Sequence, residues 1–166
     1  IGPGEAVVLP EDSQQVEHEA ELALVIGRRG RHIAEESAWE HVLGVTCAND
    51  VTARDLQRAD GQWTRGKGFD TFCPLGPWIV TDLGEAEAGD PEIACRVNGE
   101  LRQHARSSQM VFPPAVLIAS ISRIMTLEPG DLILTGTPSG VSRLYPGDEV
   151  TVEIGGVGSL SNPVAG

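Results

Sequence analysis

The chain has 166 residues, the size of a single domain that buries about 70% of its unfolded surface. It carries 12 lysines and arginines against 24 aspartates and glutamates, a formal net charge of −12. This charge argues against nucleic acid or an anionic membrane as a partner. A small anionic substrate remains compatible, because a metal ion can reverse the sign of the charge within one cleft.

No apolar run reaches the roughly 18 residues that a transmembrane helix requires, and no signal peptide is visible. We therefore expect no membrane partner and a cytoplasmic location. The three cysteines, Cys47, Cys73 and Cys95, lack a Cys-x-x-Cys spacing. We interpret them as buried free thiols in a reducing compartment, in preference to zinc ligands or disulfides.

Strand patterns dominate the first part of the chain. After a short strand in the sequence EAVVLP, residues 16–26 read as one strand of alternating character. Successive strand side chains point to opposite faces, so Glu17, Glu19 and Glu21 share one face. The other face carries His18, Ala20, Leu22, Leu24 and Ile26. Three like charges beside such an apolar face indicate either a surface bathed in water or a positive group lying against the carboxylates.

Helical patterns are fewer than strand patterns. We expect helices over residues 35–43 and 51–58, and a third over residues 113–125, where proline is acceptable in the first turn. The pair Asn98-Gly99 predicts a type I′ turn between two strands of a hairpin.

Turn signals are frequent in the second half, which opens with the strand-like sequence GPWIVTD. Two Pro-Gly-Asp turns, at residues 129–131 and 146–148, each precede a strand, in LILTG and EVTVEI. The final sequence GGVGSLSNPVA indicates a last hairpin. We therefore expect one domain over residues 1–166, mainly β with a few short helices.

The paired carboxylates of Glu19 and Glu21 suit a divalent cation. Hard cations such as Mg²⁺ prefer oxygen ligands, and Glu-x-Glu on a strand presents two carboxylates on one face. The sequence CANDVTARD offers Asp50 as a third ligand, followed by Arg54 and Asp55. A solvated charged face is the alternative, although the apolar sequence LALVIG that follows looks too buried to flank one.

Two further segments carry candidate chemistry. In QWTRGKGFDTFCPLGPW, glycines permit close backbone approach, and Lys67 could steady a carboxylate or an enolate oxygen; a surface ion pair is the alternative. In LTGTPSG, backbone N–H groups and the Thr137 hydroxyl could bind an anion, or the segment is simply a turn. The four histidines show no triad order, and we interpret them as structural or solvated.

Taken together and in this order, these segments resemble the catalytic domain of the fumarylacetoacetate hydrolase family. The matching sequences are EAELALVIG, GVTCANDVTARDLQ, QWTRGKGFDTFCPLGPWIV, VNGELRQ and LEPGDLILTGTPSGV, from about residue 17 to residue 163. The resemblance implies a mixed β-sandwich roll and a homodimer.

The resemblance also implies a set of site residues. The family's three metal-binding carboxylates match Glu19, Glu21 and Asp50, with Mg²⁺ or Mn²⁺ as the ion and with Glu17 as a supporting residue. The positions that hold the substrate's carboxylate and oxo groups match Arg54, Gln57, Lys67 and Thr137. Lys67 and Glu21 are the residues that we expect to serve catalysis.

The function that the resemblance implies is metal-dependent chemistry on a small 2-oxo acid. It would be acylpyruvate C–C hydrolysis, oxaloacetate-type decarboxylation or 2-hydroxy-diene-dioate isomerisation, each through a metal-stabilised enolate. The family's general acid/base is a His–Glu pair on a lid upstream of the first strand, and we expect this chain to lack that segment. The alternatives are a non-catalytic module that binds metal and 2-oxo acids, and a purely structural domain.

Overall fold

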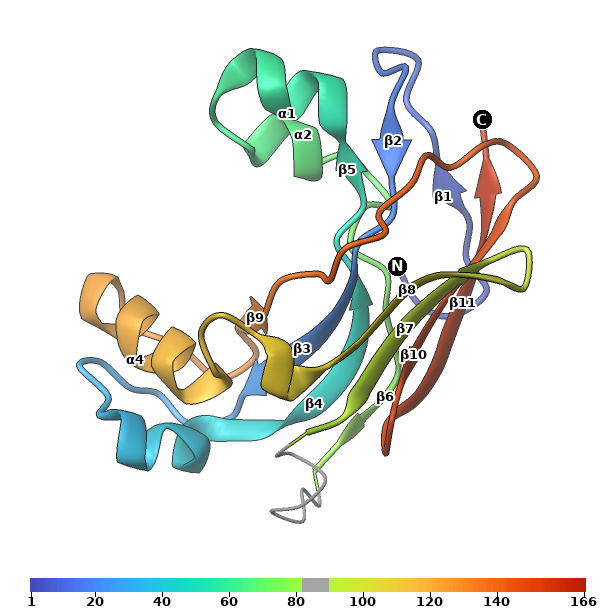
Figure 1. Cartoon of the computed structure of the whole chain (residues 1–166). Helices are drawn as coiled ribbons and strands as arrows, with labels where there is room; N and C mark the ends of the chain where they lie inside the picture. The colour runs from blue at the N-terminus through green and yellow to red at the C-terminus, as the bar shows by residue number, and fades with distance from the viewer. Residues whose placement is uncertain (82–89) are drawn as a thin grey trace.

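Two β-sheets packed against each other form the body of the protein (Figure 1). The computed structural model describes residues 1–81 and 90–166. One sheet contains, in spatial order, β1 (Val7–Val8), β11 (Gly158–Ala165), β10 (Glu149–Ile154), β7 (Glu92–Val97) and β8 (Glu100–Arg106). The other contains β6 (Leu75–Val80), β4 (Val42–Asn49), β3 (Ala20–Ile26) and β9 (Leu132–Leu134). All neighbouring pairs in these sheets are antiparallel except β1 with β11.

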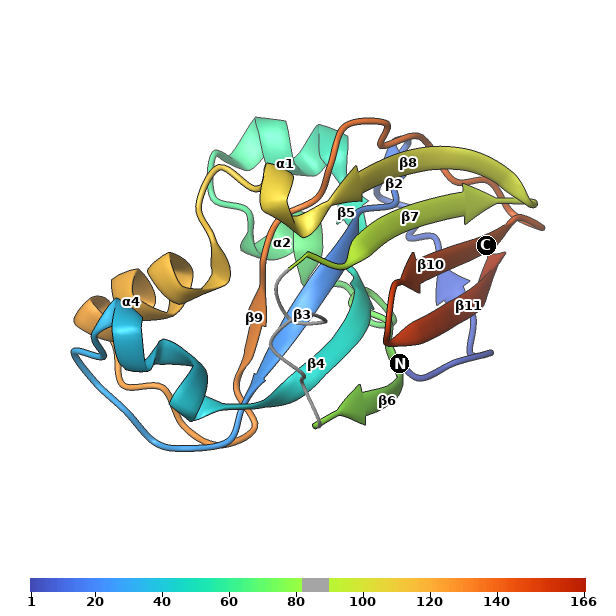
Figure 2. The ribbon, with the colours of Figure 1, turned by 60° about the horizontal axis from the view of Figure 1, so that its bottom comes forward.

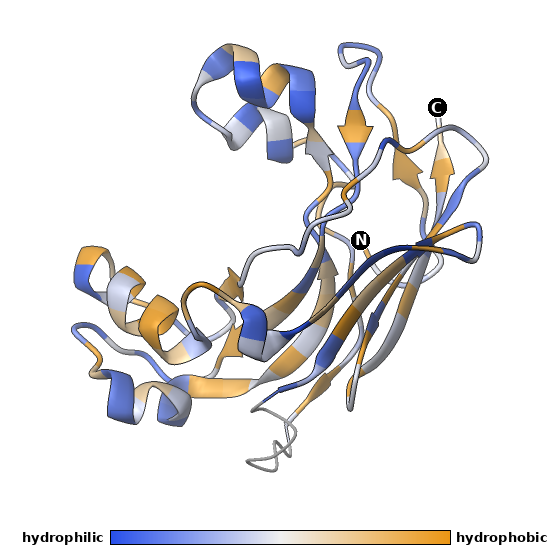
Figure 3. Ribbon diagram, viewed as in Figure 1, coloured by the Kyte–Doolittle hydropathy of each residue, from blue (hydrophilic) through white to orange (hydrophobic). Residues whose placement is uncertain are grey.

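The core lies between the two sheets. The strands β3 and β4 contribute Leu22, Leu24, Ile26 and Cys47, and the facing sheet contributes Ile93, Cys95, Val150, Val152 and Leu160. Every residue of β3 is buried, including the carboxylate of Glu21. A water-bathed acidic face is therefore excluded for this strand. Figure 3 shows that β3 consists mainly of hydrophobic residues, coloured orange, whereas β8 carries many hydrophilic residues, coloured blue.

The expected continuous strand over residues 16–26 is wrong in one respect. It is broken into β2 (Val16–Glu17) and β3, with His18 and Glu19 between them. The break occurs because β2 does not join the four-stranded sheet of β3 but pairs with β5 (Thr52–Ala53) in a separate two-stranded sheet. The backbone N–H of His18 instead donates to the carbonyl of Ser142.

Two of the three expected helices differ from the prediction. Residues 35–43 form a 3₁₀-helix, η1 (Glu35–His41), because Val42 already pairs with Ile26 as the start of β4. The helix expected over residues 51–58 begins later and is α1 (Arg54–Asp60). It begins at Arg54 because Thr52 and Ala53 pair with β2 as a strand.

The remaining helices are α2 (Thr64–Lys67), η2 (Ser107–Gln109) and α4 (Pro114–Ile124), the last of which confirms the helix expected over residues 113–125 to within one residue. Figure 2 shows that α1 and α2 lie together beside β5, whereas η1 and α4 lie together at the other end of β3. Among the described residues, no helix combines the length and apolar character needed to cross a membrane.

The predicted hairpin is confirmed. Asn98 and Gly99 join β7 to β8 and have φ angles of 53° and 80°, the positive values that a type I′ turn requires. The predicted free thiols are confirmed as well, with Cys47 and Cys95 buried and Cys73 half-buried.

Candidate metal centre

Three carboxylates converge where β3 begins and β4 ends. Glu19 immediately precedes β3, Glu21 lies on it, and Asp50 immediately follows β4. The antiparallel register pairs Ala20 with Asn49, so the two strand ends bring the three residues together. One oxygen atom from each of Glu19, Glu21 and Asp50 lies within 4.8 Å of the others.

Backbone bonds fix this convergence. The N–H of Asp50 donates to the carbonyl of Glu19 at 2.9 Å, and the N–H of Glu19 donates to the Asn49 side-chain oxygen at 2.9 Å. Asn49 is buried, and its side-chain nitrogen has no partner among the described residues. The turn between β4 and β5 is therefore held against the start of β3 by both main-chain and side-chain contacts.

Lys67 supplies one positive charge to the cluster. Its Nζ donates to Glu19 Oε2 at 3.0 Å, to Thr52 Oγ1 at 3.0 Å, and to Asp50 Oδ2. Gly66 makes this placement possible, because a Cβ at that position would come within 3.0 Å of the Gln57 Cβ. The expected close backbone approach in this glycine-rich segment is confirmed at Gly66.

Arg54 supplies the other positive charge. Its Nε donates to Glu17 Oε2 at 2.8 Å, its Nη1 to Gln57 Oε1 at 2.7 Å, and its Nη2 to Glu19 Oε1. Glu17 is thus an ion-pair partner of Arg54. Because Gln57 accepts with its oxygen, its side-chain N–H₂ group does not bond to Arg54, and it has no acceptor among the described residues.

Glu21 bonds to neither cation. One oxygen accepts the backbone N–H of Gly136 at 2.6 Å. The side chain is 3% exposed, and burial, with further contributions from the charges of Asp50 and Glu19, raises its pKa to about 7. Burial also raises the pKa of Asp50, against the lowering effect of Lys67.

The charges of the cluster do not balance. The carboxylates are Glu17, Glu19, Glu21 and Asp50, and the cations bonded to them are Arg54 and Lys67. When all six groups are ionised, two negative charges remain in a buried environment, where unbalanced charge is costly. An all-oxygen donor set with two excess negative charges fits a hard divalent cation such as Mg²⁺ or Mn²⁺.

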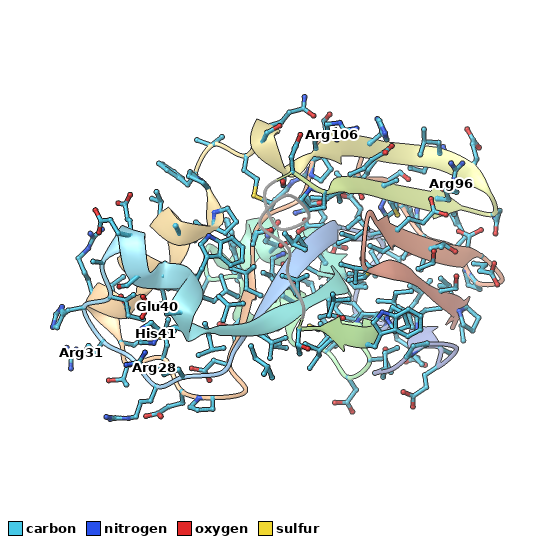
Figure 4. All side chains as sticks on the ribbon, turned by 90° about the horizontal axis from the view of Figure 1, so that it is seen from below. Arg28, Arg31, Glu40, His41, Arg96 and Arg106 are labelled. Atoms are coloured by element: carbon cyan, nitrogen blue, oxygen red, sulfur yellow. The ribbon has the colours of Figure 1, made fainter. Side chains whose placement is uncertain are left out.

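Several other arginines lie elsewhere. Figure 4 shows Arg28 and Arg31 at the end of the molecule near η1, and Arg96 and Arg106 on the sheet that contains β7 and β8. Arg28 forms an ion pair with Glu40, Arg96 with Glu153, and Arg106 with Asp90. Arg28, Arg96 and Arg106 therefore do not offset the excess charge of the cluster.

The Thr137 hydroxyl faces inward. It donates to the carbonyl of Ala20 at 2.8 Å and accepts a hydrogen bond from Gln103 Nε2 at 2.8 Å. Its single hydrogen is therefore engaged within the protein. The backbone N–H of Thr137, in contrast, has no acceptor among the residues that the structure describes.

A cavity of about 400 Å³ adjoins the Gly136–Thr137 segment. Its apolar lining comes from Ile93, Ala105, Met110, Val111, Phe112 and Leu117. The loop of residues 135–139, from β9 toward β10, forms one wall of the cavity, and Gly136 also bonds to Glu21. Gly136 and Thr137 thus line the cavity and also bond to β3 beside the carboxylate cluster.

Sequence reasoning missed three contributors to this region: Asn49, Thr52 and Gln103. The Gly136 N–H lies in the loop whose N–H groups were expected to bind an anion, and it donates to the Glu21 carboxylate. The register of β3 against β4 would have indicated Asn49, because it lies beside Asp50. Gln103 is 83 residues from Ala20 and 34 residues from Thr137 along the chain, and no sequence signal marks its contacts.

Comparison with known proteins identifies the family. The family model described as fumarylacetoacetate (FAA) hydrolase, C-terminal, matches residues 1–165. The chain belongs to the fumarylacetoacetate hydrolase family. Protein Rv2993c of Mycobacterium tuberculosis is 52% identical over 99% of this chain and 62% of its own length. The mitochondrial oxaloacetate tautomerase fahd2 of Xenopus laevis is 50% identical over 99% of this chain and 54% of its own.

Solved structures of fumarylacetoacetate hydrolase-like proteins share the fold. A 5-carboxymethyl-2-hydroxymuconate delta-isomerase from Mycobacterium smegmatis is 51% identical, with a TM-score of 0.96 over 99% of this chain and 64% of that chain. A fumarylpyruvate hydrolase from Pseudomonas aeruginosa, solved with Mn²⁺ and pyruvate, is 33% identical, with a TM-score of 0.92 over 99% and 73%. The chain spans less than two thirds of the length of the two sequence relatives.

Proposed function

We propose that this domain is the catalytic part of a divalent-metal-dependent enzyme that acts on small 2-oxo acids through enolate chemistry. The observation that carries the proposal is the convergence of Glu19, Glu21 and Asp50, in which Glu19 and Glu21 are buried and Glu21 bonds to neither Arg54 nor Lys67. The relative solved with Mn²⁺ and pyruvate, a 2-oxo acid, supports both the ion and the substrate class.

Glu19, Glu21 and Asp50 would hold the cation. A divalent cation in this position supplies positive charge that stabilises the enolate form of a 2-oxo acid. Lys67, whose ammonium group donates to Glu19, Asp50 and Thr52, would add a second positive charge near the oxygen on which negative charge develops.

The substrate's carboxylate would meet donors that have no acceptor within the part of the chain that the structure describes. Gln57 offers its side-chain N–H₂ group, because its oxygen is taken by Arg54. Thr137 offers its backbone N–H, since its hydroxyl hydrogen is bonded to Ala20. Arg54 holds Gln57 and Glu19 in place and adds positive charge. Each residue of the expected substrate-binding set, Arg54, Gln57, Lys67 and Thr137, thus has a proposed role.

The rest of the substrate would extend into the adjoining cavity. Its apolar lining from Ile93, Met110 and Leu117 suits a hydrocarbon substituent on a 2-oxo acid. Acylpyruvate hydrolysis, oxaloacetate-type decarboxylation or tautomerisation, and diene-dioate isomerisation all pass through an enolate. The relatives include an oxaloacetate tautomerase, a 5-carboxymethyl-2-hydroxymuconate delta-isomerase and a fumarylpyruvate hydrolase.

A calorimetric titration of oxalate, a planar mimic of a pyruvate enolate, tests the proposal. Wild-type protein should bind oxalate only with Mg²⁺, and Glu21→Gln should not bind it. Glu153→Gln removes a carboxylate on β10 that pairs with Arg96 on β7. This variant is the matched control and should bind oxalate like wild type. Absence of Mg²⁺-dependent binding in folded wild type, or wild-type binding by Glu21→Gln, contradicts the proposal.

The alternative is a module that binds metal and 2-oxo acid without turnover. The two are separated by incubating the Mg²⁺-loaded protein with an acylpyruvate and with oxaloacetate. Release of pyruvate, or accelerated keto–enol exchange of oxaloacetate, supports the enzyme. Tight oxalate binding with neither reaction favours the module.

A further inference from the structure

Gln103 is a fully buried polar residue on β8, in the sheet that does not carry the candidate metal ligands. Its side-chain amide makes four hydrogen bonds that cross to the other sheet and to the 135–139 loop. The oxygen lies 3.1 Å from the Ala20 nitrogen and 2.9 Å from His18 Nδ1. The nitrogen lies 2.8 Å from Thr137 Oγ1 and 2.7 Å from the Pro138 carbonyl.

The partners determine how this amide is oriented. The Ala20 N–H can only donate, so it faces the Gln103 oxygen, and the Pro138 carbonyl can only accept, so it faces the nitrogen. His18 Nδ1 must then carry a hydrogen, which leaves its Nε2 to accept from the Ser142 hydroxyl at 2.9 Å. Burial lowers the pKa of His18, in agreement with a neutral ring.

The same orientation fixes the Thr137 hydroxyl. Because Gln103 Nε2 donates to Thr137 Oγ1, the hydroxyl hydrogen points to the Ala20 carbonyl. Ala20 lies between two candidate metal ligands, and the neighbouring Gly136 N–H donates to Glu21. Gln103 therefore ties the strand that bears the ligands to the loop that bonds one of them.

We propose that Gln103 is a positioning residue. It sets the distance between the 135–139 loop and β3, and it thereby orients Glu21 and the Thr137 N–H. It touches neither the cation site nor the space for substrate. The role rests on the proposed function, because it matters only if Glu21 holds a metal and Thr137 binds a carboxylate. Outer partners of this kind alter metal affinity by about 10- to 100-fold when removed.

The test replaces Gln103 with methionine, which keeps the volume and removes all four hydrogen bonds. Asn162→Leu is the matched control, because Asn162 is an equally buried amide on β11 that donates to the carbonyls of Gly2 and Glu5. Both variants lose buried hydrogen bonds and stability. Only Gln103→Met should weaken Mn²⁺ binding by about tenfold or more and speed hydrogen exchange at the Gly136 amide.

The outcomes are distinct. Wild-type Mn²⁺ affinity in folded Gln103→Met, or an equal loss of affinity in Asn162→Leu, overturns the positioning role. Absence of Mn²⁺ binding in wild type overturns the proposed function, and the Gly136 amide exchange then still reports whether Gln103 holds the loop. If Gln103→Met does not fold, Thr137→Val removes one of the contacts at a half-buried position. Wild-type Mn²⁺ affinity in Thr137→Val overturns the proposal.

Discussion

Replacing Glu21 with glutamine should stabilise the metal-free protein while it abolishes metal binding. The carboxylate is buried beside Asp50 and Glu19 and bonds to neither Arg54 nor Lys67. Glutamine can still accept the Gly136 N–H with its oxygen. Its N–H₂ group also places a donor beside the neighbouring carboxylates, so the substitution replaces repulsion by attraction.

The size of the effect follows from the pKa of Glu21. Raising it from 4.5 to about 7 disfavours the ionised form in the folded state by about 3 kcal/mol. Below about pH 4.5 the carboxyl is protonated in both folded and unfolded states, so the penalty is absent. It grows as the pH rises from about 4.5 to about 7 and is complete above that range.

Denaturant unfolding from about pH 4.5 to about pH 8, without metal, measures this difference. Glu21→Gln should exceed wild type by about 3 kcal/mol at the high end, or roughly 6–12 °C in melting temperature, and by almost nothing at the low end. Saturating Mn²⁺ should raise the stability of wild type only. A variant less stable than wild type at about pH 8 without metal refutes the reasoning, as does a difference that does not change with pH.

Three further outcomes are expected. Mn²⁺ binding should release nearly one proton from Glu21 at about pH 6 and almost none at about pH 8.5; equal calorimetric enthalpies in two buffers of different ionisation enthalpy at the lower pH contradict this. Leu117→Trp should fill part of the cavity and weaken binding of bulky acylpyruvates about tenfold without changing oxalate binding, and an equal loss for oxalate contradicts the assigned space. Burial raises the pKa of Cys47 and Cys95 to about 12, so a thiol reagent should reach them only after denaturation, in contrast to half-buried Cys73.

The sequence was sufficient to predict the positions of the carboxylates. Alternation along residues 16–26 placed Glu19 and Glu21 on one side, ligand chemistry singled out Asp50 and Lys67, and the family resemblance added a role for each of the four. The structure brings all four together. The side chains converge because strand periodicity is a local property that survives even though the strand itself is broken at His18, whereas their roles in metal binding stay predictions.

The contacts that cross between sheets could not be predicted. Gln103 reaches His18 and Thr137 only because β8 packs over the start of β3, and sequence spacing contains no trace of that packing. The direction of the Thr137 hydroxyl depends on these contacts, so the expected hydroxyl donor to substrate becomes, in our proposal, a backbone donor. The homodimer, the cytoplasmic location and the upstream lid stay predictions.

The most direct test of the central claim is an anomalous-diffraction measurement on crystals of the protein grown with Mn²⁺ and oxalate. We expect one strong anomalous peak within coordination distance of an oxygen of each of Glu19, Glu21 and Asp50, with oxalate between the ion and Lys67. Crystals of well-ordered wild type without a peak among these three carboxylates, or with Mn²⁺ bound only elsewhere, would contradict the account.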